Sequence, residues 1–105
     1  MRKFQATELK EALAFAASGG QALHLHKIIV DRKKAPQCFV RAIANGEFIA
    51  HLFDQDKQRL EETARDLGVR VILIEREGTP SQHIDLCGKP LRLAQAMCGE
   101  LAHAS

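Results

Sequence analysis

The sequence predicts a single α/β domain with a four-stranded mixed sheet in the element order α-β-β-β-α-β-α, with an α+β arrangement as the alternative. Asn45-Gly46 stands between two apolar-rich runs and predicts a β-hairpin, because both central positions of such a turn require positive φ. Val69 to Glu75 is apolar on both faces, which is typical of a strand covered on both sides. At 105 residues the chain is expected to form one domain around one hydrophobic core.

The remaining elements are predicted from capping residues and hydrophobic periodicity. They are a helix at 7–18, strands at 23–31, 38–44 and 47–53, a helix from the Asp54 cap to Leu67, and a last helix with Pro90 in its first turn. Thr7 is expected to cap the first helix, which could be an addition to the core. Strand 47–53, the following helix and strand 69–75 would form a right-handed βαβ unit, so these two strands are expected to be parallel.

Charge and composition argue against several classes of protein. The formal net charge is +2, and the one compact basic cluster, Arg32-Lys33-Lys34, has no aromatic residues among its cations, so nucleic-acid binding is not expected. No apolar run approaches the roughly 20 residues of a membrane span, so no membrane partner is expected either. Three cysteines without Cys-x-x-Cys spacing, and no secretory segment after Met1, predict a cytoplasmic location.

The polar stretch between Gly78 and Pro90 holds the residues with the clearest chemical capability. His83 and Asp85 lie there, and a parallel βαβ unit would bring them and His51 to the carboxyl ends of neighbouring strands, where open α/β sheets bind ligands. Cations beside the free N–H groups of a helix start favour anions. We therefore expect a small anionic ligand, such as one bearing phosphate. Its predicted binding residues are His51, His83, Asp85, Lys89 and Arg92.

Several alternatives remain open for the same residues. His51 could be a core histidine, and Asp85 could cap the last helix. His24 and His26 would project from one face of a strand, where they could share a metal ion or simply lie on a half-wet surface. A metal-dependent hydrolase would use the set Asp31, His51, His83 and Asp85.

A third class of function is self-association, because the edges of a short sheet and its apolar faces could pair with a second copy as a homodimer. No glycine-rich phosphate loop, dinucleotide turn or nucleophile elbow is present in the sequence, and the sequence leaves the identity of any cofactor unknown.

Short motifs in a fixed order resemble a family of small bacterial proteins catalogued as domain of unknown function 4031. They are Ile29-Val30-Asp31, His51-Leu52 before a helix, and His83-Ile84-Asp85-Leu86 before a helix rich in alanine and leucine. The resemblance covers about residues 28–99, and Arg32 and Ile84 stand where that family has aspartate and tyrosine. It implies a shared polar set of Asp31, His51, His83 and Asp85 without naming a reaction.

Overall fold

The computed structural model describes residues 1–26 and 49–104, with side chains described as far as Cys98. The expected strand 38–44, the hairpin at Asn45-Gly46, and Asp31 lie outside the described residues.

Four strands form one mixed sheet in the order β1-β2-β3-β4. The strands are β1 at Arg2–Phe4, β2 at Gln21–His26, β3 at Ile49–Asp54 and β4 at His83–Leu86. Strand β1 pairs parallel with β2, whereas β2 pairs antiparallel with β3, and β3 antiparallel with β4. The α/β class and the four-stranded mixed sheet predicted from the sequence are therefore confirmed.

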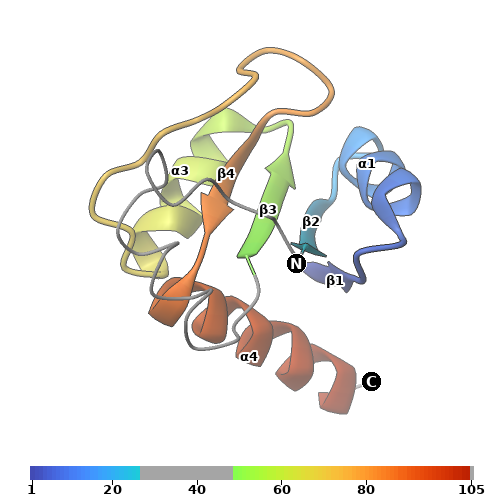
Figure 1. Ribbon diagram of the computed structural model, residues 1–105, viewed down its shortest axis with the longest axis vertical. Coiled ribbons are helices and arrows are strands. Elements are labelled where there is room, and N and C mark those ends of the chain that lie inside the picture. Colours follow the sequence, from blue (N-terminus) through green and yellow to red (C-terminus); the bar gives the residue numbers. More distant parts are fainter. Residues whose placement is uncertain (27–48, 105) are drawn as a thin grey trace.

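Helices cover both faces of this sheet (Figure 1). They are α1 at Leu9–Ala17, α3 at Lys57–Asp66 and α4 at Gly88–Ala104. Helix α1 packs Ala12 and Ala16 against Phe53 on one face. Helices α3 and α4 close the other face with one larger apolar cluster, whose buried residues include Leu23, Leu52, Leu60, Ile84 and Leu91. Within the described residues, no helix is both long enough and apolar enough to cross a bilayer.

Two of the predicted helix caps are wrong. Helix α1 begins after Glu8 rather than after Thr7. The cap of α3 is Asp56, whose carboxylate accepts a hydrogen bond from the N–H of Arg59, and not Asp54, which ends β3 in full burial. The predicted end of α3 is confirmed, since Gly68 adopts a φ of 83°, a left-handed conformation that glycine tolerates best.

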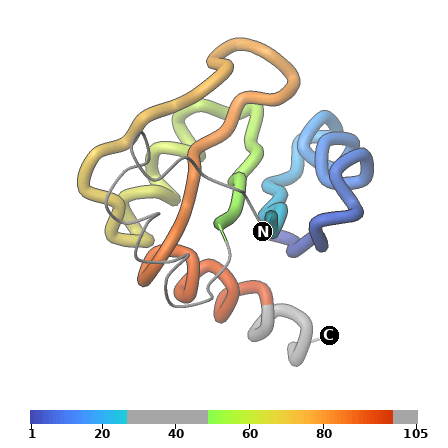
Figure 2. The backbone as a smooth tube through the Cα atoms, in the orientation of Figure 1, coloured from blue at the N-terminus to red at the C-terminus, as the bar shows by residue number. Residues whose placement is uncertain are grey.

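The predicted strand at 69–75 is also wrong. That segment pairs with the sheet only at Glu75, which forms a bridge with His83, while Val69, Ile72 and Ile74 pack against the larger apolar cluster. These side chains are thus partly buried without a hydrogen-bonded ladder, which shows how far tertiary context decides β structure. Figure 2 shows the chain leaving α3 and making a long excursion before it returns as β4.

The parallel pair of strands is also not the one expected from the sequence. The expected βαβ unit is absent, because its second strand, 69–75, does not form and β3 pairs with β4 in antiparallel orientation. The parallel crossover is instead β1-α1-β2, which uses a strand at Arg2–Phe4 that the sequence did not predict. The antiparallel pairing of β3 with β4 decides which side chains meet on the sheet surface.

Candidate metal centre

One face of the sheet carries a row of histidines from three strands. Side chains alternate between the two faces of a strand, so residues paired across strands project from the same face. The register pairs His24 of β2 with His51 of β3, and His51 in turn with Asp85 of β4. His83 pairs with Phe53 and therefore lies on this face too. Leu52, Ile84 and the other apolar residues between them project into the core on the opposite face.

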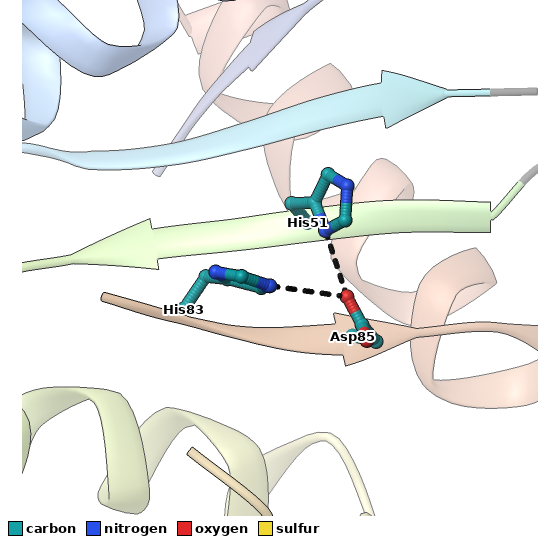
Figure 3. A group of neighbouring side chains, drawn as sticks. All are labelled: His51, His83 and Asp85. Atoms are coloured by element: carbon teal, nitrogen blue, oxygen red, sulfur yellow. Dashed lines mark hydrogen bonds and ion pairs between the residues drawn. The ribbon is translucent and has the colours of Figure 1, made fainter. Parts of the chain in front are cut away.

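His51, His83 and Asp85 converge at the β3–β4 pair, as Figure 3 shows. The Oδ1 atom of Asp85 lies 2.7 Å from Nδ1 of His51 and 3.5 Å from Nε2 of His83. Within the described residues, this is the group of histidine, cysteine and acidic side chains able to hold a metal ion, with one ligand atom of each within 4.8 Å of the others. His83 is buried and the other two are half-buried, so the three atoms are largely screened from bulk water.

The backbone fixes the tautomer of His83. Its Nδ1 lies 2.8 Å from the carbonyl oxygen of Ser81, which can only accept, so Nδ1 carries the proton. In the neutral ring the lone pair is then on Nε2, the atom that faces the carboxylates of Asp85 and Glu75 at 3.5 and 3.6 Å. A histidine held through one nitrogen by a carbonyl, with the other nitrogen facing a site, is the usual arrangement of a metal ligand.

The trio is electrostatically coupled. Burial alone would raise the pKa of Asp85, but hydrogen bonds from His51 and His83 hold that pKa far below its usual range, so the carboxylate is anionic. Burial likewise acts to lower the pKa of His83, yet the interactions with Asp85, Ser81 and Glu75 outweigh it and the pKa is raised. The site therefore binds one proton on His83 readily, and a cation of higher charge could take the place of that proton.

His24 and His26 extend the row of histidines toward β1. The ring of His26 lies 4.6 Å from that of His51, and the ring of His24 lies 6.2 Å from it, measured between ring centroids. Burial lowers the pKa of both His24 and His26, which favours their neutral forms. His24 donates from Nε2 to the carbonyl of Ala6, and among the described residues its buried Nδ1 has no hydrogen-bond partner.

The two cations predicted for the ligand site lie elsewhere. Lys89 and Arg92 are exposed on α4, the helix whose buried residues pack on the face opposite the histidines. Within the described part of the chain, Lys89 makes no hydrogen bond or ion pair with His51, His83 or Asp85. The structure thus brings three of the five predicted residues together and places the two cations on another element.

The three residues meet for a different reason from the one expected. His51 lies in the middle of β3 and His83 is the first residue of β4, so neither stands at the carboxyl end of a strand. Antiparallel register, rather than parallel strand ends, brings them together. Asp85 bonds to His51 from within β4, so it does not serve as the cap of α4.

Sequence reasoning missed Glu75, whose carboxylate lies 3.6 Å from Nε2 of His83, and the Ser81 carbonyl that orients the ring. The sequence does contain a signal for strand β4, the polar-apolar alternation of His83-Ile84-Asp85-Leu86, since a period of two residues indicates a half-buried strand.

Comparisons of the chain with protein-family models, with curated proteins and with solved structures found no match. The resemblance to the bacterial family stays a prediction.

Proposed function

We propose that this protein binds a divalent transition-metal ion through His51, His83 and Asp85. The observation that supports this is the convergence of three ligand atoms within 4.8 Å on two paired strands. Zinc bonds of about 2.0–2.1 Å in tetrahedral geometry place ligand atoms about 3.3 Å apart. The present separations of 2.7 and 3.5 Å around Asp85 are close to that value, so small rotations of the side chains would admit an ion.

The donor set selects the class of ion. Two imidazole nitrogens and one carboxylate oxygen suit zinc and other first-row divalent ions better than calcium or magnesium, which prefer all-oxygen sites. Asp85 is already anionic. The proton on Nε2 of His83 has to leave, and the proton that Nδ1 of His51 donates to Asp85 has to leave or move to Nε2 of the same ring. The hydrogen bond of His83 to Ser81 supplies the outer contact that orients a metal-bound imidazole.

Three protein ligands leave one coordination position open, which is typical of catalytic rather than purely structural zinc sites. A water molecule in that position would become a nucleophile near neutral pH, which keeps the metal-dependent hydrolase of the sequence hypotheses as the reaction to test first. The anionic ligand predicted from the sequence would then bind to the ion itself. Direct binding without an ion is less favoured, because the Asp85 carboxylate lies between the two histidines and Lys89 projects from another element.

Calorimetric titration of the purified protein with zinc, after dialysis against a chelator, tests the proposal. We expect one ion per chain. Replacing a ligand by His83→Gln or Asp85→Asn should weaken binding at least about 100-fold, since even outer contacts of metal ligands are worth about 10–100-fold.

His26→Gln is the control, because it makes the same change on the same face of the sheet at a histidine that packs against His51 and is not one of the three proposed ligands. Its zinc affinity should stay within about threefold of the parent. Undiminished binding in the His83→Gln and Asp85→Asn proteins, each with a native circular dichroism spectrum, would exclude the proposed centre. Loss of binding in His26→Gln would place the ion elsewhere on the histidine face.

A further inference from the structure

A pocket of about 510 Å³ lies along the outer edge of β4. This volume is within the range of about 300–1,000 Å³ that is usual for small-molecule sites. Its walls are mostly apolar. They come from segment 69–75, which is part of the long connection between α3 and β4, and from β4 and the start of α4. The apolar lining residues are Val69, Val71, Leu73, Ile84, Leu86 and Pro90.

The pocket borders the proposed metal centre through two carboxylates. Glu75 and Asp85 both line it, and both lie within 3.6 Å of Nε2 of His83. Glu75 is also the point at which the excursion joins the sheet, through two backbone hydrogen bonds with His83 of 2.8 and 3.0 Å. One wall of the pocket is therefore attached directly to a proposed metal ligand.

The apolar wall on the excursion is left uncovered. Val71 and Leu73 are 71% and 70% exposed, the highest values among the large apolar side chains that the structure describes. Alternate residues of the same segment, Ile72 and Ile74, pack on the core, so Val71 and Leu73 stand together on its outer side. Neighbouring exposed apolar residues beside a polar site commonly mark a surface that a ligand or partner covers.

The charges around the pocket indicate what the ligand carries. Its charged lining residues are Arg70, Glu75 and Asp85, which sum to −1. A bound divalent ion changes this sum to +1, and that complements a monoanion. A carboxylate oxygen is also a good ligand for zinc-type ions.

We propose that the pocket binds a monocarboxylate with a short apolar chain. This inference rests on the proposed function: the carboxylate takes the open position of the metal ion at His51, His83 and Asp85, and the chain covers Val71 and Leu73. It narrows the anionic ligand predicted from the sequence to a carboxylate with an apolar body.

Titration of the cobalt-loaded protein with acetate and with hexanoate tests the inference, because the visible absorption of cobalt changes when the fourth ligand changes. Hexanoate should bind at least about 10-fold more tightly than acetate, since added methylenes leave water. Hexylamine, a cation of the same chain length, should leave the spectrum unchanged. The methyl NMR signals of Val71 and Leu73 should shift with hexanoate and not with acetate.

The double variant Val71→Ser/Leu73→Ser separates the pocket from the ion. Both side chains are exposed, so the fold and the cobalt affinity should be preserved, while hexanoate binding should fall to the level of acetate. Leu93→Ser is the matched control, since Leu93 is an exposed leucine on α4 outside the pocket lining.

The other possible outcomes would overturn either the pocket assignment or the metal centre on which it rests. Equal binding of acetate and hexanoate would overturn the pocket assignment while the metal site remains. Failure to bind cobalt would refute the proposed function itself. If the double variant changes the molar mass in light scattering and leaves hexanoate affinity intact, the exposed wall is covered by a second copy of the chain, and the carboxylate inference is wrong.

Discussion

Two carboxylates, on neighbouring strands of one sheet, have opposite kinds of partner. Asp54 at the end of β3 is fully buried, and both of its oxygens lie 2.7 Å from donors of Arg59. Gln21 also donates to Asp54, at 3.0 Å. Asp85 in β4, on the other face, is paired with two histidines of the described part of the chain, His51 at 2.7 Å and His83 at 3.5 Å.

The difference lies in whether the partner can lose its charge. Arg59 keeps its proton at any ordinary pH, and its guanidinium also donates to the carbonyls of Gly19 and Gly20, so it ties α3 to the end of α1. An imidazole, unlike a guanidinium, can release its proton within the physiological pH range and then offer a lone pair to a metal ion. A carboxylate paired with arginine therefore stabilises the fold, whereas one paired with histidines is suited to exchange a proton for a ligand.

The largest expected effect is on stability, in the variants Asp54→Asn and Asp85→Asn compared without metal. Both changes keep the side-chain volume and remove a charge. Asp54→Asn leaves the half-exposed guanidinium of Arg59 facing an amide where it had a fully buried carboxylate, and it should cost about 2 kcal/mol of unfolding free energy. Asp85→Asn weakens the hydrogen bonds of one half-buried carboxylate with His51 and His83 and should cost about 1 kcal/mol. Urea unfolding at pH 7 measures both, and a larger cost for Asp85→Asn would contradict the distinction between the two carboxylates.

The second expected effect is a pH dependence of the unfolding free energy, which comes from Asp85 and its histidines and not from Asp54 and Arg59. The lowered pKa of Asp85 stabilises the fold above the unfolded value of about 3.9, and this contribution disappears as the pH falls through the folded pKa. The raised pKa of His83 stabilises it below about 6.5, and this contribution disappears as the pH rises through the folded pKa. The metal-free protein should therefore gain most from this pair between about pH 4 and 6.5.

Zinc affinity should change in the opposite direction, rising with pH because the ion competes with the proton on His83. Urea unfolding in EDTA at several pH values, together with zinc titrations at pH 6 and 8, measures the two trends. Asp85→Asn is the reference, since it keeps His24 and His26, whose lowered pKa values contribute to both proteins. A parent protein whose stability follows the same pH profile as this variant would show that the centre is not coupled as described.

Hydrophobic periodicity and helix-ending residues in the sequence correctly predicted the buried face and the end of α3. The stripe of Leu60, Ala64 and Leu67 is buried as expected for an amphipathic helix, and Gly68 ends that helix. Asp54 and Asp56 are both good capping residues two positions apart, and the tertiary contacts with Arg59 and Gln21 assign Asp54 to the core. Capping chemistry alone could not choose between them.

The candidate metal centre shows more clearly that local sequence patterns do not determine tertiary contacts. His51, His83 and Asp85 were chosen for their chemistry, and the structure brings them together, but the predicted parallel strands were wrong. Val69 to Glu75 has a stronger β pattern than His83 to Leu86, yet only the latter forms a ladder with β3. Which of two nearby segments pairs depends on long-range packing, and a single sequence does not encode that as a local signal.

The smallest expected effect is at Gln21, whose side chain supports Asp54 from β2. Its amide donates to Asp54 and, at 2.9 Å, to the hydroxyl of Thr63 in α3, so Gln21→Ala removes two hydrogen bonds of one neutral donor group while the Arg59 pair stays intact. The loss should be about 1 kcal/mol of unfolding free energy, and zinc affinity should change less than about twofold, because Gln21 lies on the face opposite the histidines. Urea unfolding and zinc titration of the same preparation measure both quantities. A tenfold change in zinc affinity would mean that the two carboxylate centres are coupled through β3, and their separation into a structural and a ligand-exchanging centre would then be wrong.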